Sequence, residues 1–349
     1  MLKFFNANQK DFTKKLELIL NVRNLKQRNQ STSVKKILTD VKRQGDKAVI
    51  KYEKKFSRIS SKGKKIKFSK NEINKIIKNL SKDLKKSIDI AYSRIKKFHL
   101  KQKYSSFKFR DEYKNELSYN YSPIEKVGVY VPGGTASYPS TVLMNCIPAI
   151  VAGVKNIYLT TPSMGTSVNP AIIYAAKKCG VKEIYKTGGA HSIAALTYGT
   201  KTFKKVNKIV GPGNAFVTAA KKEVFGEVGI DMVAGPSEVS IIADKYSNPE
   251  WIASDLIAQA EHDMLAQSIL ITNSKDLIKS VNLSLKTQLI DLPKKQIASK
   301  SIKNYGLAIF ANNQSKIVDV VNTIAPEHLE IYLSKYKNIL RKIKNAGSI

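Results

Sequence analysis

The sequence predicts an α/β fold built around parallel sheets and preceded by helices. Two stretches, 34–56 and 71–102, carry apolar residues at the three- and four-residue spacing of amphipathic helices. From Val127 onward, short runs rich in β-branched and aromatic residues alternate with helical patterns. Such alternation is typical of strands joined by crossover helices, which is how parallel sheets are connected.

Seven short runs have the composition of strands. They are VGVYV (127–131), NIYLTT (156–161), EIYKTGG (183–189), NKIVGPG (207–213), EVSIIAD (238–244), SILIT (268–272) and GLAIFA (306–311). A polar and aromatic stretch, 108–126, separates them from the helical part and is expected to be a linking segment. We find no sequence repeat.

Three of the junctions that follow these runs are rich in glycine: VPGGTASYPST (131–141), TGGAHSIAA (187–195) and VGPGNAFVT (210–218). In a parallel sheet such junctions share the edge formed by the carboxyl ends of the strands, where ligands bind. Glycine lets the backbone approach a ligand closely, and the helix N-terminus behind it favours phosphate. None of the three is a GxGxxG, and tight turns need glycine in any case. Three in succession nevertheless favour a nucleotide cleft.

Composition excludes several classes of protein. The hydrophobic share of 42% and the charged share of 25% are those of an ordinary globular protein. Two cysteines make no disulfide framework and suit a reducing cytoplasm. The N-terminus lacks the pattern of a secretory signal, and the most apolar stretch, 142–154, is too short to span a bilayer. We expect a cytoplasmic protein without a membrane partner.

The formal net charge of +33 leaves one alternative open, a non-catalytic protein that binds polyanions. The basic residues are mostly lysines spread along amphipathic helices, as in SSKGKKIKFSK (60–70), and are not set among arginines and exposed aromatics. Solvated helix faces explain that distribution better than a nucleic-acid surface. We therefore expect no nucleic-acid partner.

A candidate metal site lies in AQAEHD (258–263). Gln259 and His262 are three residues apart, so on a helix they share one face and could aim at a common point. Taken alone the pair is a weak signal, because Gln is a poor zinc ligand and such pairs usually belong to a solvated polar face.

A second candidate site is Glu327–His328 in APEHLEI. Pro326 restricts the preceding residue and marks a turn or helix boundary. At a turn, the acid and the imidazole could flank one ligand and perform two separate proton transfers. A surface acid beside a partly buried histidine is the plainer reading of this motif in isolation.

In this order, VGVYVPGGTASYPSTVLMN, GGAHSIAALTYGT, KIVGPGNAFVTAAK, IDMVAGPSEV, IAQAEHD and NTIAPEHLEI resemble histidinol dehydrogenase. The resemblance runs from about Val34 to the last residue. It implies paired, incomplete Rossmann-like domains, a homodimer, and oxidation of L-histidinol to L-histidine with NAD and Zn²⁺. A relative that acts on another amino alcohol or on a sulfonated alcohol stays open.

The resemblance also assigns roles residue by residue. Gln259 and His262 match zinc ligands that also lie close to the substrate, and Glu327 and His328 match the acid–base pair, with His328 near the substrate as well. Ser237 matches a substrate contact, and Tyr130 and Asn214 match cofactor contacts. His328 would take the hydroxyl proton, and Glu327 would activate the water that hydrates the aldehyde.

The chain departs from the family in two places. His191 stands where the family has a cofactor-contacting Gln, so we expect it to face the cofactor. The family also continues beyond the position of Ile349 into a zinc-binding Asp and a tail with a zinc-binding His, a substrate-contacting Glu and part of the dimer interface. We therefore expect the chain as printed to lack that tail domain and to be impaired.

The expected domain organisation follows the change of pattern at Val127. We predict an N-terminal helical segment (1–30), a discontinuous α/β domain (31–129 plus 240–349), and a second α/β domain (130–239) inserted into it.

Overall fold

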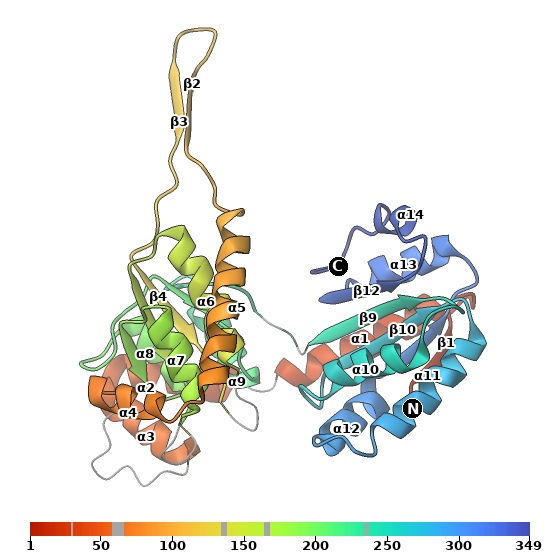
Figure 1. The fold of residues 1–349 in the computed structure, drawn as a ribbon, viewed down its shortest axis with the longest axis horizontal. Coiled ribbons are helices and arrows are strands. Elements are labelled where there is room, and N and C mark those ends of the chain that lie inside the picture. The colour runs from red at the N-terminus through yellow and green to blue at the C-terminus, as the bar shows by residue number, and fades with distance from the viewer. Residues whose placement is uncertain (29–30, 58–65, 134–137, 164–167, 234, 236) are drawn as a thin grey trace. The chain divides into compact units, whose positions relative to one another are not determined.

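The structure is a computed structural model that describes residues 1–349 apart from 29–30, 58–65, 134–137, 164–167, 234 and 236. The chain divides into two units. Unit 1 comprises Met1–Arg28 and Gly235–Ile349, and unit 2 comprises Asn29–Ala234. Each unit contains one five-stranded parallel sheet with helices packed on it (Figure 1). The predicted α/β fold with two parallel-sheet domains is confirmed.

The sheet of unit 1 joins the start of the chain to its last third. The strand order is β1 (Lys3–Asn6), β11 (Leu307–Phe310), β10 (Gln267–Thr272), β9 (Glu238–Ala243) and β12 (His328–Tyr332), and all neighbours are parallel. One face is covered by α10 (Pro249–Ala260), α11 (Lys275–Gln288) and α12 (Lys295–Tyr305). The other is covered by α1 (Phe12–Arg28) and α13 (Gln314–Ile324), with the short α14 (Lys337–Leu340). Because both faces are covered, the central strand β10 is buried at every residue.

Unit 2 repeats this arrangement. Its strand order is β6 (Glu183–Tyr185), β5 (Asn156–Thr160), β4 (Lys126–Tyr130), β7 (Lys208–Val210) and β8 (Gly229–Ile230), again parallel throughout. One core contains residues of α2 (Ser31–Gln44), α3 (Asp46–Ser57), α8 (Gly189–Tyr198) and α9 (Ala215–Val224). The other contains residues of α5 (Lys82–Leu100), α6 (Pro139–Ala152) and α7 (Pro170–Lys178), and partly buried isoleucines of α4 (Lys70–Lys78) pack against it.

The domain boundaries differ from those we predicted. The segment 31–129 packs with 130–234 and does not join 240–349, because helices α2 to α5 bury their apolar faces in the two cores of unit 2. The expected N-terminal helical segment contains a strand, β1, which pairs with β11 and so belongs to unit 1. The change of pattern at Val127 marks the change from helices to strands, and not a domain boundary.

Local sequence also divides the two predicted helices. Gly45 takes a left-handed conformation with φ of 54° and separates α2 from α3. Ser81 accepts a hydrogen bond from the Leu84 N–H and caps α5, which separates it from α4. Among the described residues, no helix is both long enough and apolar enough to cross a membrane.

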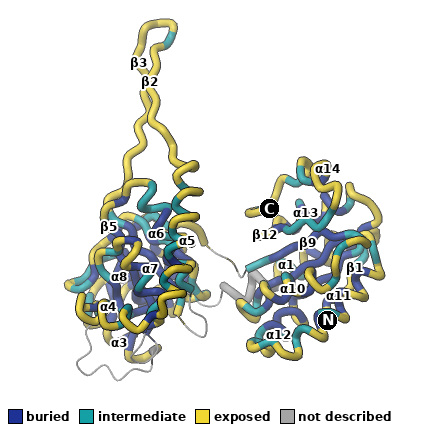
Figure 2. Tube along the Cα trace, in the orientation of Figure 1, coloured by how far each residue is buried: buried dark blue, intermediate teal, exposed yellow. Residues whose placement is uncertain are grey.

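The linking stretch 108–126 contains an antiparallel hairpin that the sequence did not lead us to predict. Strands β2 (Phe107–Arg110) and β3 (Glu116–Tyr119) pair with each other and form a separate two-stranded sheet. Both strands are exposed along their whole length (Figure 2).

Candidate functional site

The end of α10 presents the first candidate pair. Asn248 caps the start of this helix and Pro249 occupies its first turn, and the helix ends at Ala260. The Nδ1 atom of His262 lies 2.7 Å from the Ala258 carbonyl oxygen. Since a carbonyl can only accept, the neutral ring carries its proton on Nδ1 and its lone pair on Nε2. Gln259 is half-buried and His262 is exposed, so both can reach a ligand.

The second candidate pair lies where α13 turns into β12. Ala325 adopts a left-handed conformation with φ of 50° and ends α13, which confirms the boundary predicted at Pro326. His328 is then the first residue of β12. Glu327 and His328 are both about half exposed, with His328 Nδ1 3.8 Å from a Glu327 carboxylate oxygen.

One residue of the neighbouring strand holds both members of this pair through its main chain. The Glu238 N–H donates to Glu327 Oε2 over 3.2 Å, and the Glu238 carbonyl oxygen lies 3.2 Å from His328 Nδ1. That contact requires a proton on Nδ1, so in the neutral ring the lone pair of His328 lies on Nε2, where it can accept a proton. The acid and the imidazole are thus oriented separately, and each keeps a basic atom for a ligand.

Gly347 and Ser348 contact the turn at Glu327 from its other side. Ser348 N–H donates to the Glu327 carbonyl over 2.9 Å, and Leu329 N–H donates to the Ser348 carbonyl over 2.9 Å. A Cβ atom at Gly347 would lie 2.7 Å from the Glu327 carbonyl oxygen, so glycine is required for this approach.

All of these residues lie at the amino ends of the strands of unit 1. Ser237 immediately precedes β9 and is half-buried, and its main-chain carbonyl oxygen accepts the Gln267 N–H at the start of β10 over 3.0 Å. Gln267 is paired with Glu238 and His328 with Val239, so β9, β10 and β12 begin together. Because α10 connects two parallel strands, it runs back along the sheet and ends at this same edge.

The three residues matched to cofactor contacts lie in unit 2, where Tyr130 ends β4. Its ring is buried, its hydroxyl accepts the Gly189 N–H over 3.1 Å, and burial raises its pKa to about 12. A Cβ atom at Gly211 would lie 2.1 Å from the Tyr130 carbonyl oxygen, which explains why this junction needs glycine. Tyr130 therefore connects the glycine-rich junctions that follow β6 and β7.

Asn214 is exposed and caps α9, with its side-chain oxygen accepting the N–H groups of Phe216 and Val217, each over 3.1 Å. Sequence reasoning missed the buried Lys221, which donates to the Gly211 carbonyl over 3.0 Å and pairs with Asp231. This ion pair fixes the junction in front of Asn214. The signal in the sequence that could have revealed this buried ion pair was a lysine on the inner face of an amphipathic helix.

His191 is placed differently from what the resemblance led us to expect. Its ring points into unit 2, is 2% exposed, and has Nε2 2.9 Å from a Glu53 carboxylate oxygen. The Thr187 hydroxyl donates to the same carboxylate oxygen. The first glycine-rich junction lies partly outside the described residues, at 134–137.

The inward position of His191 leads to a stability prediction. We expect His191→Leu to lower the free energy of unfolding by about 1–3 kcal/mol, because the buried Glu53 carboxylate loses a hydrogen-bond donor. His191→Gln keeps an amide donor and serves as the matched control, with stability and NAD affinity close to those of the parent. Urea unfolding measures the first effect. A Leu variant as stable as the parent would show that the contact with Glu53 is unimportant.

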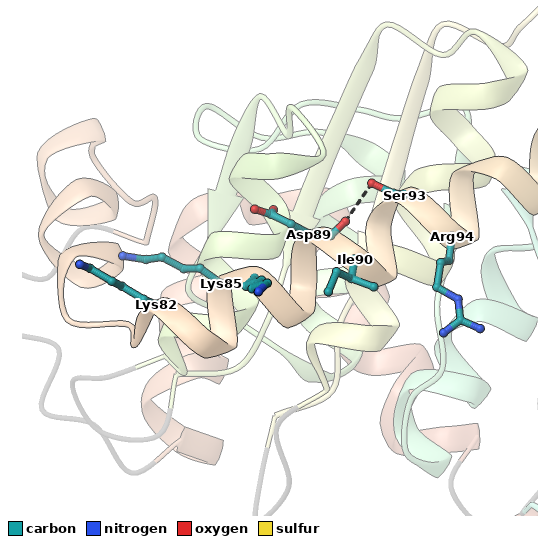
Figure 3. Close-up of a pocket in the computed structure, with 7 residues that line it drawn as sticks. Lys82, Lys85, Asp89, Ile90, Ser93 and Arg94 are labelled. Atoms are coloured by element: carbon teal, nitrogen blue, oxygen red, sulfur yellow. Dashed lines mark hydrogen bonds between the residues drawn. The ribbon is translucent and has the colours of Figure 1, made fainter.

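A hollow of about 580 Å³ on unit 2 contains none of the candidate residues (Figure 3). Its lining residues are Lys82, Lys85, Lys86, Asp89, Ile90, Ser93 and Arg94. All seven belong to α5, so the hollow is the outer face of a single helix and brings no groups together from different elements. This arrangement agrees with the interpretation of the lysines as solvated helix faces.

The Histidinol dehydrogenase family matches residues 20–349. A histidinol dehydrogenase of Pelagibacter ubique is 54% identical over all of this chain and 81% of its own length, and one of Brucella abortus is 43% identical with the same coverage. The crystal structure of histidinol dehydrogenase from Elizabethkingia anophelis superposes with a TM-score of 0.89 at 38% identity, covering 99% of this chain and 79% of that one.

Proposed function

This chain belongs to the histidinol dehydrogenase family of NAD-dependent oxidoreductases, and we propose that Glu327 and His328 perform the proton transfers of its reaction. The reaction is the oxidation of L-histidinol through L-histidinal to L-histidine, in histidine biosynthesis. The observation that carries the assignment is the main chain of Glu238, which orients both side chains and leaves Nε2 of His328 free.

The two side chains have separate tasks because the oxidation has two stages. Loss of a hydride from the alcohol requires a base for the hydroxyl proton, and His328 Nε2 accepts it. The aldehyde must then gain water before a second hydride can leave, and the Glu327 carboxylate accepts a proton from that water. Once its first proton has passed to solvent, His328 accepts a hydroxyl proton of the hydrate. NAD, when bound, accepts the hydride at each stage.

We propose that Tyr130 and Asn214 contribute to NAD binding and that Ser237 contacts the substrate. The two glycine-rich junctions tied by Tyr130 lie at the carboxyl ends of β6 and β7, where parallel sheets bind ligands. His191 acts there through Glu53, as an internal support.

We propose that Gln259 and His262 hold Zn²⁺ and, with His328, contact the substrate. The chemistry of His262 fits, because its Nδ1 donates to a backbone carbonyl and orients a lone pair on Nε2, as metal-binding histidines commonly do. The pair is a partial set: within the described ranges, no group of three His, Cys, Asp or Glu side chains could hold a metal. When bound, zinc polarises and anchors the substrate.

The function is tested by the stoichiometry of NADH. We expect the protein, supplied with Zn²⁺, to form about two NADH per L-histidinol, since alcohol-to-acid oxidation releases two hydrides. Turnover of a sulfonated alcohol with no turnover of histidinol would indicate a different substrate. Salt-sensitive DNA binding without NADH formation would support the polyanion alternative.

We also propose a homodimer in which the hairpin contacts the second copy. Aromatic side chains on the hairpin and just beside it are exposed and stack on one another. The ring centroids of Phe107 and Tyr119 on the strands are 5.9 Å apart, and those of the flanking Tyr104 and Tyr121 are 5.2 Å apart. A lone two-stranded ribbon is only marginally stable, and exposed apolar patches usually mark interfaces.

The dimer is tested by light scattering at micromolar concentration. We expect the parent to have the mass of a dimer and the double variant Phe107→Ser, Tyr119→Ser to shift toward the monomer. Tyr246→Ser, which changes an exposed tyrosine of unit 1, is the control. A dimer unaffected by the double variant would exclude the hairpin from the interface, and a monomeric parent would refute the homodimer.

A further inference from the structure

We infer that the side chains of Asp255, Glu330 and Tyr332 form a positioning cluster for the active site of unit 1. The cluster ties α10, whose end carries Gln259, to β12, which begins at His328. The inference rests on the function proposed above, and it concerns three residues to which that function assigns no role.

The central contact joins the helix to the strand directly. The Tyr332 hydroxyl donates to Asp255 Oδ2 over 2.5 Å. This hydrogen bond, together with burial, raises the pKa of Tyr332 to about 12, so the tyrosine stays a donor at neutral pH. Its carbonyl oxygen also accepts the Ser247 hydroxyl over 2.8 Å, which fixes the far end of β12. A hydrogen bond to a charged acceptor is stronger than one between neutral groups.

Glu330 is the third member of the cluster and interacts with the same carboxylate. It lies between His328 and Tyr332 on β12 and is half-buried. Burial and the nearby Asp255 carboxylate raise its pKa to about 7. The raised pKa favours the protonated form of Glu330, in which its carboxyl group is a donor for the Asp255 carboxylate.

Strand alternation places the acid–base histidine on the side of the sheet that α10 covers. Leu329 and Ile331 pack into the core with α1 and α13, whereas Tyr332 packs into the core with α10. Since side chains alternate along a strand, His328 and Glu330 share the face of Tyr332. Asp255 and Gln259 are four residues apart and share one face of α10.

The spacing along each row gives its reach from the cluster. From Tyr332 back to His328 is four residues of strand, or ~13 Å. From Asp255 forward to Gln259 is four residues of helix, or ~6 Å, and His262 lies just beyond the helix end at Ala260. Because α10 runs opposite to the strands, both rows extend from the cluster toward the amino edge of the sheet. The cluster thus sets the register in which Gln259 and His262 approach His328.

Tyr332→Phe is the decisive variant because it removes only the hydroxyl, and Tyr246→Phe makes the same change at an exposed site of unit 1. We expect Tyr332→Phe to weaken zinc binding, titrated with the ion alone against a chelator, by roughly tenfold, as loss of an outer partner of a metal site does. We expect kcat to fall by a similar factor, with little change in the KM for NAD. Glu330→Gln keeps a donor to Asp255 and should retain zinc affinity and kcat within about twofold, whereas Glu330→Leu should behave like Tyr332→Phe.

The outcomes separate the cluster from the function on which it rests. A parent protein that forms no NADH from histidinol refutes the proposed function. An active parent whose Tyr332→Phe variant matches Tyr246→Phe in zinc affinity and kcat refutes the cluster. Lowered thermal stability with unchanged zinc affinity and kcat also refutes it, because that result describes a purely structural contact.

Discussion

Glu327→Gln is expected to slow the second half of the reaction by about 10²–10⁴-fold while leaving the first half nearly intact. Loss of a general base typically costs this much, and only aldehyde oxidation needs an activated water. Gln keeps a side-chain oxygen that can accept the Glu238 N–H, so the orientation of residue 327 is preserved. Starting from histidinol, a rapid burst of one NADH per site should be followed by slow formation of the second.

The control for this variant is Glu250→Gln, which makes the same change in the first turn of α10, at the opposite end of that helix. It should show both phases at parental rates. Equal slowing of both phases in Glu327→Gln would assign the carboxylate to a step common to them and would rule out the water-activating role.

Sequence reasoning located most strands because their residues are buried on both faces. The runs at 127–131, 156–161, 238–244 and 268–272 overlap β4, β5, β9 and β10, whose side chains fill the cores. Strand β12 was not predicted, because its first residues were interpreted as part of an acid–base motif at a turn. Strand β1 has four residues and needs β11, some three hundred residues along the chain, to become a strand.

The roles of main-chain groups could not be predicted. Glu238 and Glu327 are 89 residues apart, and the contact between them depends on the parallel pairing of β9 and β12. The side chain of Glu238 has no part in that contact, so no choice of residue type signals it. Sequence similarly could not show that His191 turns inward, because a histidine in a glycine-rich junction suits a ligand contact or a buried hydrogen bond equally well.

The predicted domain boundary was wrong for a related physical reason. Amphipathic helices in 31–129 show that an apolar face is covered, but their periodicity carries no information about which sheet covers it. Val34 and Ala194 lie in one core, which assigns the first of these helices to unit 2, and that packing is visible only in three dimensions.

His328→Asn is expected to reduce both halves of the reaction by about 10²–10⁴-fold, in contrast to Glu327→Gln. Both the alcohol and the aldehyde hydrate must lose a hydroxyl proton as the hydride leaves, and Nε2 of His328 is the base that accepts it. Asn places its amide nitrogen near the position of Nδ1, so the donor to the Glu238 carbonyl is kept while the basic nitrogen is lost. Single-turnover rates of NADH formation from histidinol and from histidinal measure the two halves. His99→Asn, a substitution in unit 2 at a histidine to which no role is assigned, is the control and should leave both rates unchanged. If His328→Asn slowed only the aldehyde half, the roles of the two residues would have to be exchanged.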